Sequence, residues 1–424
     1  MNIKLKQTML VPYIAILLMI LAFVFSTPMD LLVGLKEIYF SKSNLLTDYI
    51  QLAGLGPTLL NSSILVLFSY AIVRMTKTPI SGPVFAGLMT ILGFSFFGKN
   101  LLNSSIIFFG VFLYAIYKKI SLRSVIVVLL FSSGLAPISS VIMFGLELSL
   151  WISIPLGIIV GIFSGFILME LAPHVIKFHN GYDLYNVGFA GGILAIVAYS
   201  FIKLTNSTYH FSILVNDTYH YQLLIISLFI VLVLMIVGFI ANGKTLDNYK
   251  HILKKSGRSV TDFTRKNREG IALFNSGLTG LIVITTLLVL GIKFTAPAFG
   301  GIMTVIGFGC FGKHPKNIIP PLLGVILVVL IFGLDFNDIS ITLAIIFSTA
   351  LAPISGEYGI VVGLLTGMLH LPIVSNISNI HGGIILYSNG FAAAFTAVVV
   401  HMIMVALERS DKPWQFMKSK KTSK

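Results

Sequence analysis

Apolar stretches of about 20 residues, the length that a helix needs to cross a bilayer, recur along the whole chain with short polar connections between them. The first stretch is not followed by the small-residue cleavage site of a signal peptide, so we expect it to remain as a spanning helix. The candidate segments cover residues 9–28, 56–75, 80–97, 101–117, 121–143, 148–171, 184–203, 221–243, 270–292, 295–311, 317–333, 337–354, 356–372 and 383–407. The pattern predicts an all-α integral membrane protein with about 14 transmembrane segments.

The positions of the basic residues support this count, because cytoplasmic loops are enriched in Lys and Arg. With the N-terminus inside and every segment crossing, 24 of the 29 Lys and Arg residues face the cytoplasm, many of them in the connection 244–268 and the tail 408–424. The five external residues are Lys36, Lys42, Lys99, Lys203 and Lys293. We therefore expect a multi-pass protein of the bacterial cytoplasmic (inner) membrane, with both termini in the cytoplasm.

Composition agrees with a membrane location. Hydrophobic residues make up 56% of the 424 residues and charged residues only 10%, with a mean hydropathy of +0.96. Such a chain cannot cover a water-facing surface. The net charge of +14 is explained by loops that orient the chain and contact anionic lipid, so the expected partner is the bilayer and not nucleic acid. The single cysteine, Cys310, lies in an apolar run and allows no disulfide.

The chain also repeats itself. SGPVFAGLMTILGFSFFGKN from Ser81 matches TAPAFGGIMTVIGFGCFGKH from Thr295 at ten of twenty positions, and FSSGLAPIS from Phe131 matches FSTALAPIS from Phe347 at seven of nine. Further on, HNGYDLYNVGFAGG from residue 179 matches HGGIILYSNGFAAA from residue 381 at seven of fourteen. The predicted organisation is a first helix with an external connection (1–55), repeat 1 (56–203), a connecting helix with a basic loop (204–269), repeat 2 (270–407) and a basic tail (408–424).

The number of crossings between the copies predicts their relative orientation. Asn61 lies in the second segment and the matching Asn275 in the ninth. Seven crossings separate them, so the second copy is expected to run through the membrane upside down. Inverted-topology repeats are typical of secondary transporters, although some channels and membrane enzymes carry them too.

Each copy carries a proline inside a very apolar segment, at Pro137 and Pro353. Proline removes a backbone donor and obstructs helical geometry in the residue before it, so we expect Pro-broken helices. Interrupted helices at matching positions of two halves point to a substrate site, here for a polar solute or a sodium ion. The alternative is an ordinary proline kink with hydroxyls bonded to their own helix. The candidate hydroxyl ligands are Ser132, Ser133, Ser139, Ser348, Thr349 and Ser355.

Further paired residues are candidates for the same pathway. The amides of Asn61 and Asn275 are polar groups inside apolar helices, and Thr90 and Thr304 could line a path. Two lysines end the matching FGK motifs. They could attract an anion at each mouth, but snorkelling of the amine to the membrane interface is favoured. These lysines are Lys99 and Lys313.

A last constellation predicts a gate on each face. His179 and Tyr185 precede the last helix of repeat 1, and His381 and Tyr387 precede that of repeat 2. An interfacial aromatic anchor is the simpler alternative. Carboxylates are nearly missing from the spans, and Glu357 is the one that we would test as a coupling residue. This favours sodium coupling through neutral oxygens, or simple facilitated diffusion, over a proton relay.

The paired P-x-F-x-G-x-M-T, LAPIS and LY-x-x-GFA blocks resemble a bacterial membrane-protein family of unknown function that carries two copies per chain. The resemblance covers most of the sequence and implies no activity or site residues. The count of seven plus seven segments is also similar in architecture to nucleobase and anion transporters. No motif for ATP hydrolysis, Ser hydrolases or zinc peptidases occurs, so we expect neither an enzyme nor a cofactor or metal.

The sequence therefore favours a permease for a small polar solute that works by alternating access. The alternatives are a channel-like facilitator, a lipid or polyprenyl-phosphate flippase and a lipid-modifying membrane enzyme. The chain could also form a homo-oligomer.

Overall fold

The computed structural model describes residues 10–204, 209, 213–259, 261–265 and 268–410, and this part of the chain is helical with no β-strand. Most of the predicted basic tail lies outside the described residues. The first half contains α1 (Leu10–Phe25), α2 (Pro28–Tyr39), α3 (Tyr49–Ala53), α4 (Leu55–Met75), α5 (Gly82–Phe94), α6 (Leu101–Tyr117), α7 (Leu122–Ser132), α8 (Ala136–Phe144), α9 (Leu150–Phe178) and α10 (Asn186–Leu204). The second half contains α11 (His220–Ala241), α12 (Tyr249–Leu253), α13 (Glu269–Val289), α14 (Ala296–Phe308), α15 (Pro315–Phe332), α16 (Ile339–Phe347), α17 (Ala352–Tyr358), α18 (Ile360–Ile380) and α19 (Ser388–Ser410).

Every predicted segment contains a helix, but the count of 14 crossings is not confirmed. Among the described residues, ten helices are long and apolar enough to span a membrane. The pair α1 and α2 would add one more span, although it bends by 115° where Thr27 and Asp30 form a capping box around Pro28. Helices α5 and α14 have 13 residues each, or about 20 Å at 1.5 Å per residue, against a hydrocarbon core of about 30 Å.

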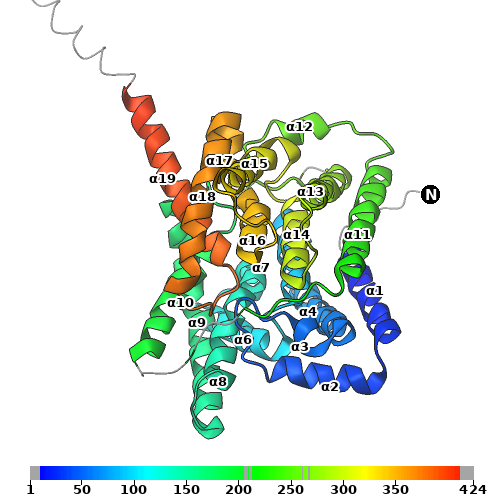
Figure 1. Cartoon of the computed structure of the whole chain (residues 1–424), viewed down its shortest axis with the longest axis vertical. Helices are drawn as coiled ribbons and strands as arrows, with labels where there is room; N and C mark the ends of the chain where they lie inside the picture. The colour runs from blue at the N-terminus through cyan, green and yellow to red at the C-terminus, as the bar shows by residue number, and fades with distance from the viewer. Residues whose placement is uncertain (1–9, 205–208, 210–212, 260, 266–267, 411–424) are drawn as a thin grey trace, which may run out of the picture.

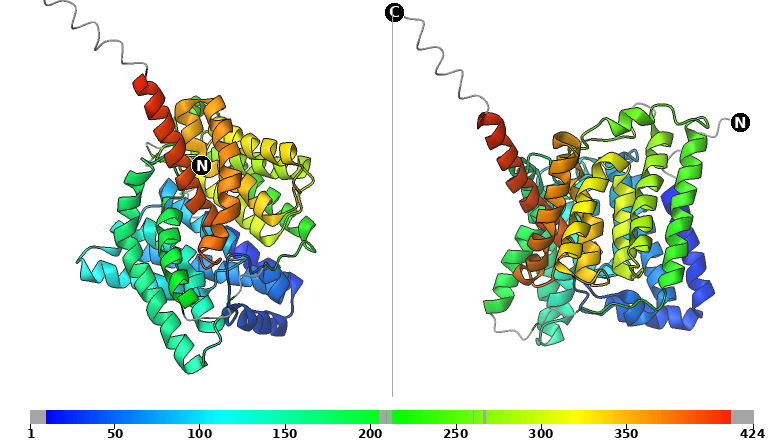
Figure 2. Two further views of the ribbon diagram at one scale, coloured as in Figure 1. Left: turned by 60° about the vertical axis from the view of Figure 1, so that its left-hand side comes forward. Right: turned by 45° about the horizontal axis from the view of Figure 1, so that its top comes forward.

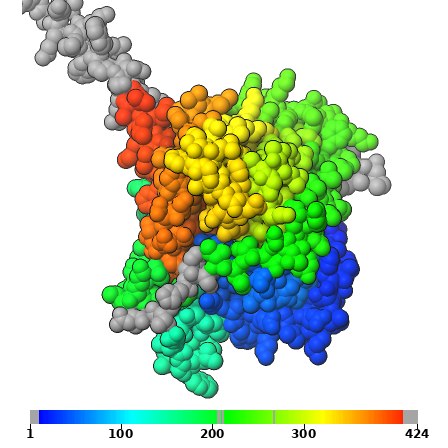
Figure 3. Space-filling model, viewed as in Figure 1, coloured from blue at the N-terminus to red at the C-terminus, as the bar shows by residue number. Residues whose placement is uncertain are grey.

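The helices of the two halves pack in matching pairs. Helix α1 packs on α4 as α11 packs on α13, and α6 packs on α9 as α15 packs on α18. Matching helices also meet each other, α5 with α14 and α10 with α19. In Figure 1, α8 lies at the bottom of the molecule and its counterpart α17 at the top, and the views of Figure 2 agree. The space-filling view shows one continuous packed body, with α1 and the helices after it in blue below the yellow helices of the second half (Figure 3).

Helices α5 and α14 form the centre of the fold and run antiparallel. A Cβ atom on Gly93, late in α5, would lie 2.6 Å from the carbonyl oxygen of Gly300, early in α14. A Cβ on Gly307, late in α14, would lie 2.9 Å from the Cα of Ala86, early in α5. Small residues allow such close backbone approach in membrane helices. Both helices are almost completely buried, so they form an internal core and are not exposed to lipid.

The proline breaks take the form of short 3-10 turns. Residues Ser133–Leu135 connect α7 to α8, and Ser348–Leu351 connect α16 to α17. Each proline lies in the first turn of the following helix, where the missing N–H has no helical partner to lose. The α-helix is therefore interrupted as expected, yet each pair still counts as one candidate span.

Candidate functional site

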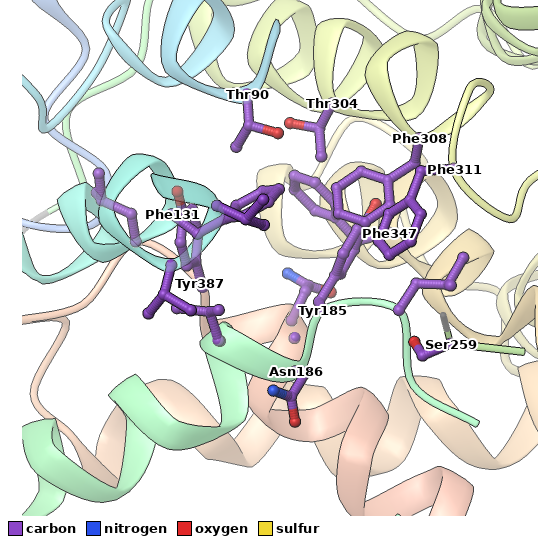
Figure 4. A pocket seen from close by; sticks show the side chains of 18 of the residues that line it. Thr90, Phe131, Tyr185, Asn186, Ser259, Thr304, Phe308, Phe311, Phe347 and Tyr387 are labelled. Atoms are coloured by element: carbon purple, nitrogen blue, oxygen red, sulfur yellow. The ribbon is translucent and has the colours of Figure 1, made fainter. Parts of the chain in front are cut away.

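A cavity of about 160 Å³ lies where the two halves meet. Both halves supply the same residue types at matching positions. Thr90 of α5 and Thr304 of α14 lie next to each other on one side of it, with their hydroxyls pointing toward each other, and Tyr185 and Tyr387 lie on the other side (Figure 4). The matching aromatic residues in the wall are Phe94 and Phe308, and Phe131 and Phe347. None of the described residues that line the cavity has a charged side chain.

The aromatic walls are built by contacts that the halves exchange. The rings of Phe94 and Phe347 lie 5.9 Å apart, and those of the matching Phe308 and Phe131 lie 5.6 Å apart. Phe94 also meets Tyr387 at 5.1 Å, and Phe308 meets Tyr185 at 4.8 Å. Such edge-to-face and offset pairs are favourable arrangements of aromatic rings. The exchange of equivalent contacts gives the cavity approximate two-fold symmetry.

Each lysine of the FGK motifs reaches a tyrosine of the other repeat. The amine of Lys99 donates a 2.7 Å hydrogen bond to the hydroxyl of Tyr387, a contact that we call the first latch. The amine of Lys313 donates to the hydroxyls of Tyr185 and of Thr349, the latter at 2.7 Å, and these contacts form the second latch. The expectation that the lysines snorkel is wrong, because both are fully buried. Each amine also lies over the ring of its tyrosine, 4.8 Å and 4.5 Å from the two centroids.

The 3-10 turns hold the tyrosine loops of the opposite repeats. The N–H of Leu386, next to Tyr387, donates to the carbonyl oxygen of Gly134 at 3.0 Å, and the N–H of Leu184 donates to that of Ala350 at 3.2 Å. The ring of Tyr387 lies so close to Gly134 that a Cβ there would be 2.2 Å from it. Carbonyls in a 3-10 turn are less regularly paired than in an α-helix. The interruption thus provides docking groups for a loop of the other half.

The predicted asparagine ligands hold the loops that carry the lysines. The amide of Asn61 donates to the carbonyl oxygens of Ser95 and Lys99 at 2.8 and 2.9 Å. That of Asn275 donates to the carbonyl oxygens of Gly309 and Lys313 at 2.6 and 2.8 Å. The amides therefore satisfy backbone carbonyls at the ends of α5 and α14 and fix the lysine positions.

The hydroxyls at the breaks are mostly bonded to backbone. Ser132, Ser133, Ser348 and Thr349 each donate to the carbonyl oxygen three residues earlier. Ser139 donates to the carbonyl oxygen of Gly157, which joins α8 to α9. Thr349 is distinguished from the rest of this set because it also accepts from a lysine. The matching Pro137 and Pro353 are buried.

Two candidate hydroxyls have no hydrogen-bond partner among the described residues, and one candidate carboxylate lies away from the cavity. The hydroxyls of Thr90 and Ser355 are buried and without a hydrogen-bond partner in the described part of the chain, whereas Thr304 donates to the carbonyl oxygen of Gly300. Glu357 is exposed on α17 and does not line the cavity.

The paired histidines support the starts of the last helices. The Nε2 atom of His179 lies 2.9 Å from the side-chain oxygen of Asn186, and that of His381 lies 2.9 Å from the hydroxyl of Ser388. Both histidines are buried behind the tyrosine loops. Within the described residues, no group of three His, Cys, Asp or Glu side chains could hold a metal ion.

Comparison with known proteins gives one match. A family model described as "Protein of unknown function (DUF1576)" matches residues 27–204 and 241–406, most of the chain. The chain belongs to this family. No curated protein and no solved structure matches it. Membership in DUF1576 agrees with the two-repeat organisation and names no substrate, so the function must be argued from the site.

Three polar residues of this DUF1576 chain occur in one repeat only and are not among the candidate site residues above. His370 of α18 corresponds to Leu168, and Asn389 of α19 corresponds to Val187. Asp183, beside the second latch, corresponds to Ile385. A search for residues that match between the copies passes over such positions. The alignment of the two copies shows them as places where a polar residue faces an apolar one.

A second cavity, of about 220 Å³, adjoins the central one. Polar residues from α16, α18 and α19 line it, among them Ser340, Ser375 and Asn379. The two cavities share four lining residues, namely Phe94, Phe347, Leu386 and Asn389. These four side chains form the partition between the two cavities.

Proposed function

We propose that this protein is a permease that moves a small polar solute across the bacterial cytoplasmic membrane by alternating access between two inverted halves. The observation that carries the proposal is the exchanged pair of latches, whose tyrosines both line a cavity formed by the two halves together. Two equivalent closures around one site are what an alternating mechanism requires.

The arrangement of matching helices supports the inversion. The matching helices α5 and α14 run antiparallel. A two-fold rotation that exchanges them therefore has its axis perpendicular to both helices, as expected for an axis in the membrane plane. The opposite positions of α8 and α17 in Figure 1 point the same way. With both termini in the cytoplasm, the loop of Tyr387 belongs to the outer side and that of Tyr185 to the inner side. The first latch then closes the outer path and the second latch the inner path.

The strength of a latch suits a conformational equilibrium. A hydrogen bond contributes about 0.5–3 kcal/mol, depending on whether one partner is charged, and the binding of a small solute can offset this. Because each latch contains the same Lys–Tyr contact, the outward-open and inward-open states should be similar in free energy, and the solute can shift the population between them. The uncharged lining of hydroxyls, amides and rings favours a neutral solute, and the protein need not carry out chemistry on it.

Reciprocal accessibility tests this mechanism without a known solute. A reporter cysteine at position 90 (Thr90→Cys), in a Cys310→Ser background, is labelled with an impermeant thiol reagent in right-side-out and inside-out vesicles. Removing the hydroxyl in Tyr387→Phe should raise labelling from outside and lower it from inside. Tyr185→Phe should do the opposite, and the exposed Tyr117→Phe should change neither.

The two directions of labelling separate the candidate functions. A rise on one side without a fall on the other would indicate a channel and reject alternating access. Failure of the reagent to reach position 90 from either side in every variant would reject the central cavity as the pathway.

A further inference from the structure

The two repeats share the residues that build the fold and the latches, but one polar pair breaks the symmetry at the cavity. His370 and Asn389 lie side by side on α18 and α19, and repeat 1 has Leu168 and Val187 at the matching positions. The fold of repeat 1 forms with apolar residues there. The polar pair is therefore not needed for the repeat to fold.

The pair also leaves buried polar atoms unpaired. His370 is fully buried, and its ring lies beside the side chain of Asn389, but neither ring nitrogen makes a hydrogen bond of normal geometry within the described residues. The side-chain oxygen of Asn389 is likewise buried without a partner there. Unpaired buried polar groups destabilise a fold and are rare in proteins. A site that uses these atoms to bind a ligand accounts for their presence.

Asn389 lies between the two cavities. It lines both the central and the second cavity, in the partition that also contains Phe94, Phe347 and Leu386. Thr90 also lines the central cavity, and its buried hydroxyl has no hydrogen-bond partner among the described residues. The unpaired polar atoms of Asn389 and Thr90 therefore belong to residues that line one space with aromatic walls.

The shape and chemistry of this space restrict the solute. A volume of about 160 Å³ is close to that of the engineered cavity of about 150 Å³ that holds benzene. Aromatic walls favour a flat ring by stacking. A carboxamide offers one acceptor and a pair of donors, so it matches an edge with an N–H beside a C=O. The described lining residues carry no charge, and the amines of Lys99 and Lys313 behind them are already held by the tyrosine hydroxyls, so a neutral ligand avoids burying a charge without a direct partner.

We propose that Asn389 binds the solute directly, that His370 positions its amide, and that the solute is a neutral, ring-sized heterocycle with an amide-like edge. This inference rests on the proposed permease function and adds the class of solute and the residue that selects it.

Binding of three probes to the purified protein tests the inference. 2-Pyridone has the ring and the N–H beside C=O, N-methyl-2-pyridone lacks the donor, and benzoate is a charged ring of similar size. We expect the wild type to bind 2-pyridone at least tenfold more tightly than either of the other two. Asn389→Val, which copies the residue of repeat 1, should remove this preference without lowering the melting temperature.

Two further variants separate recognition from fold. His370→Leu, which also copies repeat 1, should reduce the preference for 2-pyridone over its N-methyl derivative, since the amide of Asn389 would lose its orientation. Asn376→Val, at an exposed position of α18 whose amide bonds only within its own helix, should behave as the wild type.

The outcomes distinguish this inference from the permease proposal. Equal affinity of wild type and Asn389→Val for 2-pyridone, or no binding of 2-pyridone at all, would overturn the inference while reciprocal accessibility of position 90 could still stand. Selective binding of 2-pyridone together with accessibility that does not alternate would reject the permease and leave the binding site.

Discussion

The structural role of Asn61 and Asn275 can be measured directly. Replacement by leucine keeps the approximate shape of the side chain and removes its hydrogen bonds. Asn61→Leu leaves two carbonyl oxygens, of Ser95 and Lys99, without their donor. Asn275→Leu does the same to Gly309 and Lys313, and also removes the acceptor for the hydroxyl of Tyr249, at 3.1 Å.

The sizes of the two effects follow from the number of bonds. A side-chain hydrogen bond between membrane helices contributes on average about 0.6 kcal/mol and at most about 1.7. Asn61→Leu should therefore lower the free energy of unfolding by about 1–3 kcal/mol, and Asn275→Leu by about 2–5 kcal/mol. Both should also loosen the loops that carry Lys99 and Lys313.

Reversible unfolding in mixed detergent and SDS micelles measures these differences. Ser69→Ala is the matched control on α4, two turns after Asn61, because its buried hydroxyl has no partner among the described residues. It should leave the protein as stable as before or slightly more stable. If both asparagine variants keep wild-type stability but lose solute binding, the asparagines are ligands and our assignment is wrong.

Two other predictions concern the core and pH. Gly93→Val would place side-chain carbons against Gly300 of α14, so we expect a loss of stability of more than about 3 kcal/mol or no folded protein in size-exclusion chromatography. Burial raises the pKa of Asp183, in the loop between α9 and α10, to about 8, although the Tyr185 N–H and nearby Lys313 lower it. Since a raised pKa means tighter proton binding in the folded state, stability should be highest in acid and fall as pH rises from about 4 to about 8. Thermal unfolding of Asp183→Asn across this range should lack that fall, and an identical pH profile would refute the assignment.

The sequence predicted where the helices lie and which helices of the two copies are equivalent, because both depend on local sequence pattern. Apolar runs locate the helices, and the alignment of the copies shows which residues are equivalent. Neither tells which residues of one copy touch the other. The contacts of Lys99 with Tyr387 and of Lys313 with Tyr185 arise only when the halves pack together.

The misjudged lysines have a specific physical cause. The window 80–97 is long enough to carry a following lysine to the membrane surface, which made snorkelling reasonable. The helix α5 in fact ends at Phe94, inside the protein, and its last residues pack on α14 and on the tyrosine loop. Similarly, an amide inside an apolar helix is equally consistent with a ligand and with a partner for a backbone carbonyl. For Asn61, the position of the loop at Lys99 shows that the amide is a partner for backbone carbonyls.

The site contains residues that occur in both repeats and residues that occur in only one. Lysines, tyrosines and phenylalanines that occur in both halves make equivalent contacts, so they can give the two open states similar free energies. Residues present in one half cannot serve that purpose. His370 and Asn389 place hydrogen-bonding groups beside the cavity in repeat 2 alone, and Asp183 places an acid beside the second latch alone. Protonation of Asp183 would therefore affect the second latch and leave the first unchanged, so pH on one side of the membrane should bias which path opens.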